Sequence, residues 1–176
     1  MSLSRSKMTR VVAAGAAGAL AVVGLSGCSS QSPSTAIAAG SRTISMKTFD
    51  EAVDHCGDLA QGGALSPRQV IASTLAQGAV GEQILSDTGR GLNTAQRDQI
   101  IATNGLTVLT KDPVCRDLGR SLAAMYHVVN SDGQDKALEE ITAVDVSVNP
   151  RLGTWDARNL AVHGSSSLSD PFTSGS

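Results

Sequence analysis

Apolar side chains recur at helical spacing along much of the chain after residue 45. The first run starts at Phe49 and places apolar residues at i, i+3, i+4, i+7, i+10 and i+11, which form one face of a helix. Ser45 precedes this run and is a favoured N-cap residue, so we predict a helix from about Met46 to Ala60. Cys56 lies on the apolar face of this helix, whereas His55 lies beside that face and should contact water.

Start and stop signals predict the remaining helices. The segment Ser66-Pro67-Arg68-Gln69 offers an N-cap, a proline for the first turn and a glutamine that can close a capping box. Asn93 and Asp112-Pro113 are similar start signals. Gly78 and Gly81 interrupt one apolar face, where they either weaken the helix or permit a close helix crossing. We expect helices over about 67–85, 94–103, 113–129 and 134–141.

Two segments show strand patterns instead. Residues 36–44 are typical of a hairpin around Gly40-Ser41, because glycine accepts the positive φ of a two-residue turn. Residues 144–149 alternate strictly between apolar and polar, and Pro150 ends the pattern. A lone hairpin is only marginally stable, so the later strand is its natural partner. The predicted fold is mainly α-helical over residues 36–161, with a small two- or three-stranded sheet joining the N- and C-terminal segments.

The N-terminal segment has the layout of an export signal. Three basic residues precede an apolar run from Val11 to Val23, which is shorter than the roughly 20 residues of a membrane span. Leu25-Ser26-Gly27-Cys28 follows, and this ending resembles the lipobox of bacterial lipoprotein precursors. The resemblance implies that residues 1–27 are a signal peptide cut off before Cys28, and that the Cys28 thiol is diacylated. An ordinary secretory signal or a transmembrane helix is the alternative.

Lipidation implies a protein anchored to the cell membrane on its extracytoplasmic side. Two acyl chains, such as palmitate, hold a protein on a bilayer, whereas one chain gives marginal binding. Residues 28–35 are mostly small and polar, so we expect them to be the lipidated tether. At the other end, residues 162–176 are rich in serine and glycine without periodicity, and we expect a disordered tail.

Composition narrows the partners of the mature chain. Removing the 27 signal residues takes three basic residues from the total of 14 and leaves 11 against 16 acidic ones. An acidic domain lacks the electrostatic footprint for nucleic acid and a polybasic patch for anionic lipid, so the lipid anchor must supply membrane attachment. Aromatic residues make up only 2% of the chain, which favours closely packed small helices and argues against carbohydrate or nucleotide binding.

Two cysteines remain once Cys28 is set aside. Cys56 and Cys115 are an even pair in a chain expected outside the cytoplasm, which favours a disulfide between them. The alternative is two buried free thiols that act as small hydrophobic side chains.

Candidate chemistry is sparse. The soft ligands other than Cys28 are His55, Cys56, Cys115, His127 and His163. None of them stands at a zinc-binding spacing, so we expect no metal site. Asp54 and Asp58 share a helix face, which we interpret as exposed to solvent. We interpret Trp155 as a core residue that covers the end of the last strand. We therefore expect no catalytic residues, no cofactor and no enzymatic activity.

The ends of the domain resemble a known family. Residues 36–49 match the strand, glycine turn, Thr-Ile pair and Phe-containing helix that open the SurA-type N-terminal domain of periplasmic chaperones and PrsA-like foldase lipoproteins. Residues 144–156 match the closing strand and its Pro-Arg-x-Gly-x-Trp ending, although Leu152 stands where that family has an aromatic residue. Those proteins usually carry parvulin prolyl-isomerase domains, and no segment here is long enough for one. The resemblance implies a polypeptide-handling domain without the catalytic one.

Two functions remain in view. The first is a membrane-anchored lipoprotein with chaperone-like, non-catalytic binding of exported or unfolded polypeptides in a groove between helices. The alternative is an interaction module that docks one specific cell-envelope protein. The sequence does not identify the polypeptide-binding residues.

Overall fold

The computed structural model describes residues 32–63 and 65–164, which form a mainly helical domain, as expected. The predicted signal peptide, the predicted lipidation site Cys28 and residues 165–176 lie outside the described residues. The helices are α1 (Met46–Cys56), η1 (Gly57–Ala60), α2 (Pro67–Asp87), α3 (Thr94–Thr103), η2 (Thr107–Lys111), α4 (Pro113–Asp132) and α5 (Gln134–Ala143), where η marks a 3₁₀ turn.

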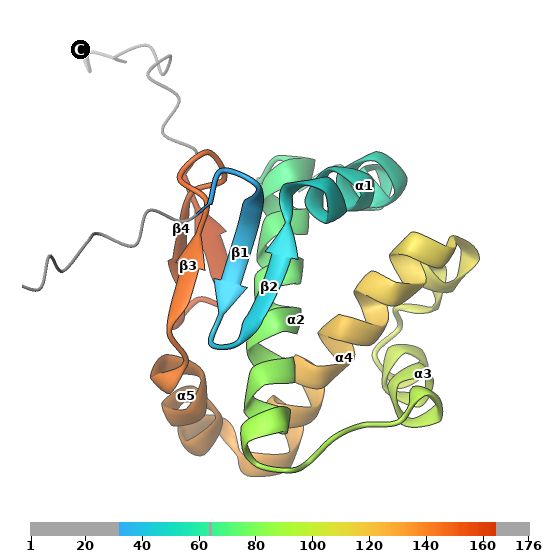
Figure 1. The fold of residues 1–176 in the computed structure, drawn as a ribbon. Helices are drawn as coiled ribbons and strands as arrows, with labels where there is room; N and C mark the ends of the chain where they lie inside the picture. The colour runs from blue at the N-terminus through green and yellow to red at the C-terminus, as the bar shows by residue number, and fades with distance from the viewer. Residues whose placement is uncertain (1–31, 64, 165–176) are drawn as a thin grey trace, which may run out of the picture. The chain divides into compact units, whose positions relative to one another are not determined.

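A three-stranded antiparallel sheet joins the two ends of the domain, as predicted. Its strands are β1 (Thr35–Ala39), β2 (Arg42–Ser45) and β3 (Val146–Val148), in the order β2-β1-β3 (Figure 1). Ile37 of β1 lies opposite Ile44 on one side and Val148 on the other. The hairpin turn contains Gly40 with a φ of +56°, which a glycine adopts without strain.

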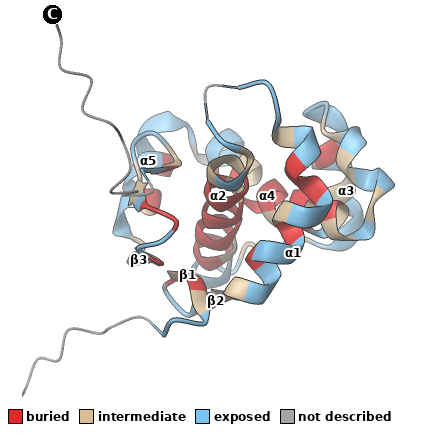
Figure 2. Ribbon diagram, turned by 90° about the horizontal axis from the view of Figure 1, so that it is seen from above, coloured by how far each residue is buried: buried red, intermediate tan, exposed pale blue. Residues whose placement is uncertain are grey.

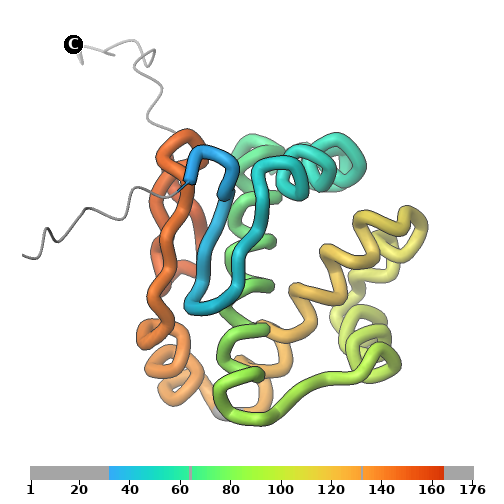
Figure 3. The backbone as a smooth tube through the Cα atoms, viewed as in Figure 1, coloured from blue at the N-terminus to red at the C-terminus, as the bar shows by residue number. Residues whose placement is uncertain are grey.

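The last residues of the expected tether are held against the sheet. The Thr35 N–H donates to the Ser32 carbonyl over 2.8 Å, and the Met46 N–H donates to the Ser34 carbonyl over 2.7 Å. The Asn149 side chain donates to the Thr35 carbonyl over 2.9 Å. Figure 3 shows that the first and last parts of the described chain lie at the same end of the sheet.

A second sheet was not expected from the sequence. Strands β4 (Thr154–Asp156) and β5 (Ala161–His163) form an antiparallel pair. Val162 is fully buried and its N–H donates to the Ser73 hydroxyl over 2.9 Å. The prediction of a disordered tail from residue 162 is therefore wrong for Val162 and His163. Three-residue strands are too short for an alternating pattern to stand out, which is why the sequence did not reveal them.

Helix α2 forms the centre of the domain, with the sheet on one side and α1 and α4 on the other (Figure 2). Gly78 and Gly81 in α2 allow α4 to cross it at close range. Of the two roles considered above for these glycines, a weakened helix or a close crossing, the structure shows the close crossing. A Cβ atom on Gly78 would lie 2.3 Å from the Ser121 hydroxyl, and one on Gly81 would lie 2.4 Å from the Met125 backbone nitrogen.

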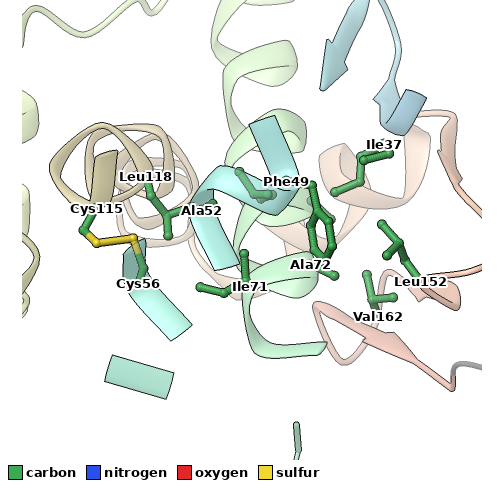
Figure 4. Close-up of a cluster of buried hydrophobic side chains, with 13 residues drawn as sticks. Ile37, Phe49, Ala52, Cys56, Ile71, Ala72, Cys115, Leu118, Leu152 and Val162 are labelled. Atoms are coloured by element: carbon green, nitrogen blue, oxygen red, sulfur yellow. A yellow bond between two sulfur atoms is a disulfide. The ribbon is translucent and has the colours of Figure 1, made fainter. Parts of the chain in front are cut away.

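The core around Phe49 includes a disulfide. Figure 4 shows Phe49 packed among aliphatic side chains, with the disulfide between Cys56 and Cys115 at the edge of the same cluster. Both cysteines are 1% exposed. The predicted disulfide is thus present, and it joins the end of α1 to the first turn of α4.

Helix starts follow the predicted capping residues. Ser45 accepts a hydrogen bond from the Thr48 N–H, and Ser66 and Asn93 each form a reciprocal capping box with the glutamine three residues later. The first helix differs at its end, because the α-helix stops at Cys56 and a 3₁₀ turn continues to Ala60. Leu59 in that turn is 48% exposed and does not belong to the buried face we expected.

Candidate functional site

An apolar groove of about 340 Å³ opens between α1 and α4, and we refer to it as the α1–α4 groove. Strand β2 and helix α2 complete its walls. The apolar lining residues come from all four elements and are Ile44, Ala52, Leu75, Val114 and Leu118. The polar lining residues are Thr48, Glu51, Asp117 and Ser121.

The local structure holds the two walls in place. Strand β2 passes directly into α1 at the Ser45 cap, so Ile44 and the first turns of α1 form one wall. The disulfide fixes the far end of α1 to α4, with the Cα atoms of Cys56 and Cys115 5.6 Å apart. The groove is therefore built from elements that are covalently and sterically constrained, rather than from mobile loops.

The charged residues that line the groove are both acidic and lie on facing walls. Glu51 on α1 forms an ion pair with Lys47 one turn earlier, and its side chain is 49% exposed. Asp117 on α4 is 75% exposed and lies 3.7 Å from Arg120, whose closer partner is Asp98 at 2.7 Å. The ion pair from Arg120 to Asp117 is therefore weak, so Asp117 is the less neutralised of the two carboxylates that line the groove.

A pair of titratable groups stands at the end of the groove walls nearest the disulfide. The His55 Nδ1 and Asp112 Oδ2 atoms are 3.0 Å apart. The other oxygen of Asp112 caps α4 by accepting from the N–H groups of Val114 and Cys115. The hydrogen bond between His55 and Asp112 is the main cause that raises the pKa of His55 and lowers the pKa of Asp112.

Stability should decrease as pH rises through the raised pKa of His55. The protonated imidazole is favoured in the folded state, so its contribution is complete below the ordinary value of 6.5 and is lost above the raised folded value. Asp112 acts in the opposite sense, because its lowered pKa makes its contribution disappear only in acid. Thermal midpoints at about pH 6 and pH 9 should differ less in His55→Gln than in the wild-type protein.

Asp112→Asn provides the matched control for this prediction. Asparagine is as good an N-cap as aspartate, so the helix start survives while the charged partner of His55 is lost. Both variants should show the same reduced dependence on pH. An unchanged wild-type dependence in both would show that the pair does not contribute. The effect should weaken with added salt, because His55 and Asp112 are partly exposed.

A second apolar groove lies between α4 and α5. It has a volume of about 290 Å³, and Leu160 from the turn before β5 contributes to its wall with a φ of +50°. Val129 and Leu138 also line it and are 37% and 40% exposed. Helical spacing counted from Val114 predicts that Val129 belongs to the apolar, buried face of the helix over 113–129. This prediction is wrong, because that face continues into an open groove beside α5.

The other residues singled out in the sequence lie apart from both grooves. His127 contacts the Ser131 hydroxyl over 3.3 Å, and His163 lies 3.9 Å from Asp156 at the β4–β5 pair. Trp155 packs against both core clusters beside the strand end, as predicted. Within residues 32–63 and 65–164, no group of three or more His, Cys, Asp or Glu side chains is placed to hold a metal ion.

The sequence did not reveal the groove residues. The sequence places Ile44 in a strand and Val114 in a helix, and their partly buried positions on the groove wall depend on how α1 and α4 diverge. Among the helices of the described residues, none is long and apolar enough to cross a membrane. Comparison with protein-family models, curated proteins and solved structures finds no match for this chain.

Proposed function

We propose that this protein is a membrane-anchored lipoprotein that binds exported or unfolded polypeptides without catalysing a reaction on them. The α1–α4 groove carries this proposal. Its walls present partly buried aliphatic side chains such as Ile44 and Val114 beside a polar rim, which is the arrangement that receives apolar segments of other chains.

The titratable groups support a binding role over a catalytic one. In the part of the chain that the structure describes, the groups whose pKa departs from its ordinary value are His55, Asp98, Asp112, Arg120 and Asp156. In each case the largest cause is a hydrogen bond to a neighbouring polar or charged side chain. None of these groups lines the α1–α4 groove. The perturbed groups are therefore accounted for by structural pairing, whereas catalytic sites usually gather such groups in a cleft.

The disulfide supports the extracytoplasmic location. Disulfides persist in oxidising compartments and are rare in the cytosol. The bond between Cys56 and Cys115 therefore fits a protein exported by the predicted signal peptide and attached through Cys28. The pairing of β3 with β1 also fits the order of elements implied by the resemblance to SurA-type domains.

The α4–α5 groove favours a second candidate function, in which the domain docks one cell-envelope protein. Leu160 holds a backbone conformation that is costly for a leucine, and such conformations are enriched at binding sites. The Gln77 side chain stabilises it by donating to the Leu160 carbonyl over 2.7 Å. A dedicated partner would use this groove, whereas general polypeptide binding would use the α1–α4 groove.

A pair of variants separates these functions. Val114→Glu places a charge on the wall of the α1–α4 groove, in the first turn of α4 where an acidic residue suits the helix dipole. It should weaken suppression of aggregation by about tenfold in effective affinity, equivalent to about 1.4 kcal/mol. Val129→Glu makes the same change in the α4–α5 groove and should leave suppression unchanged.

The assay uses the chain from Ser29 onward, without lipid and at stoichiometric ratios, with several unrelated unfolding proteins. Circular dichroism would establish that both variants are folded. If the domain suppresses the aggregation of none of these proteins, a general chaperone-like function is excluded. A dedicated envelope partner would then be favoured, and crosslinking in cells would be used to find it.

A further inference from the structure

We propose that the ligand of the α1–α4 groove is an extended aliphatic segment flanked by lysine or arginine, which adds to the free edge of β2 as a further strand. This inference rests on the proposed function and specifies the class of polypeptide that the groove selects. Three observations carry it: an unpaired strand edge, an apolar groove beside that edge and acidic side chains on the rim.

Among the strands of residues 32–63 and 65–164, the order β2-β1-β3 leaves the outer side of β2 without a partner. Arg42 lies opposite Ala39 next to the two-residue turn, and Thr43 lies opposite Ala38. Antiparallel neighbours alternate between hydrogen-bonded and non-hydrogen-bonded pairs, and the pair that flanks such a turn is hydrogen-bonded. The backbone N–H and carbonyl of Thr43 therefore point away from β1, where they can pair with an incoming strand.

This edge faces the groove. Ile44 of β2 lines the groove together with residues of α1 and α4, and Figure 1 shows β2 as the strand of its sheet nearest to α4. The opposite edge of the sheet, formed by β3, lies beside β4, and Pro150 stands two residues after the end of β3. Only the β2 edge therefore combines exposed backbone with the α1–α4 groove.

The geometry of a strand matches the groove. Successive side chains of a strand point to opposite faces, so a segment paired with β2 would direct every second side chain toward Leu75 and Val114. A volume of about 340 Å³ lies at the lower end of the range for ligand pockets, roughly 300–1,000 Å³. It is suited to a few aliphatic side chains rather than to a folded helix or a large ligand.

The rim sets the preferred charge. Glu51 and Asp117 are the charged residues that line the groove, and they flank it from opposite walls. Asp117 is largely exposed, and its neighbour Arg120 is mainly engaged by Asp98. A basic residue on one side of the aliphatic segment would pair with Asp117, and one on the other side would compete with Lys47 for Glu51, whereas acidic flanks would be repelled.

The test uses the chain from Ser29 onward, which contains all the described residues, and a fluorescent seven-residue peptide that alternates valine and serine between two lysines. Fluorescence anisotropy measures its Kd. Two further peptides carry N-methyl groups on every second backbone nitrogen: one peptide on the odd-numbered residues and the other on the even-numbered residues. In a paired strand only one of these two sets of N–H groups donates to β2. Methylation of that set should weaken binding at least tenfold, whereas methylation of the other set should leave the affinity unchanged.

Charge selection is tested with the same assay. A peptide with terminal glutamates should bind several-fold more weakly than the lysine peptide, as expected for partly exposed ion pairs. Asp117→Lys should remove this difference, and Glu139→Lys, a matched reversal on the exposed face of α5, should keep it.

The outcomes distinguish a failure of the strand-pairing inference from a failure of the proposed polypeptide-binding function. If the lysine peptide binds, is weakened by Val114→Glu and tolerates both methylated sets equally, the strand pairing is wrong while the groove stands. Equal affinity for lysine and glutamate peptides would overturn the charge preference. If neither peptide binds and aggregation is not suppressed, the proposed function fails.

Discussion

Replacing Cys56 and Cys115 together with alanine should lower the free energy of unfolding by about 4 kcal/mol. The two cysteines are 59 residues apart, so the bond removes much of the conformational freedom of the unfolded chain. It also ties α1 to α4 across the core that contains Phe49. Urea unfolding followed by circular dichroism measures the change. The urea midpoint of the alanine variant should be lower than that of the wild-type protein, with little change in the spectrum of the folded state.

Reduction provides the matched control for the disulfide. A thiol reductant should destabilise the wild-type protein to a similar extent and should have no effect on the double alanine variant. A wild-type protein whose unfolding midpoint does not change under full reduction would contradict the chain-entropy argument. The alanine variant should also lose affinity for the lysine peptide, because the disulfide positions both walls of the α1–α4 groove.

Gly81→Ala should destabilise the domain by about 3 kcal/mol, although alanine is the better helix former. A Cβ atom at this position would lie 2.4 Å from the Met125 nitrogen and 2.8 Å from the Ala124 carbonyl carbon, both of which belong to the backbone of α4. Backbone atoms cannot avoid the added methyl group by a change of rotamer, as a side chain can. Helices α2 and α4 must therefore move apart where they cross. The loss of packing between the two helices exceeds the gain of about 1 kcal/mol in helix propensity.

Gly57→Ala is the control for the glycine prediction. Gly57 has helical backbone angles, and the nearest atom to an added Cβ would be the Pro67 Cβ at an ordinary 3.7 Å. This variant should be neutral or more stable by up to about 1 kcal/mol. Similar unfolding midpoints for Gly57→Ala and Gly81→Ala would show that the helix crossing tolerates a methyl group.

Local signals in the sequence predicted most of the helical fold. Ser45, Ser66, Asn93 and Asp112 all cap helices in the structure, because capping depends on residues only two or three positions away. The alternation of residues 144–149 likewise identified the strand that returns to the hairpin. These features need no knowledge of the tertiary fold.

The features that the sequence did not reveal depend on long-range packing. Strand β5 exists because the Val162 N–H reaches Ser73 and because Val162 fills space next to α2, neither of which leaves a pattern in three residues. The α1–α4 groove arises where elements from four parts of the chain meet. Helical periodicity marks Val114 as apolar, but only the fold decides whether an apolar side chain faces the core or an open groove.

The turn at Ser32–Ser34 has a consequence for the range over which the protein acts. Because this turn is bonded to the start of α1, the chain between Cys28 and the domain is limited to residues 29–31. Fully extended, that length spans at most about 14 Å, so the acyl chains proposed on Cys28 would confine the domain to a thin layer above the bilayer. Encounters would then take place in two dimensions, with segments that emerge from or lie along the same membrane, and the local concentration of such segments would permit a weak groove to act.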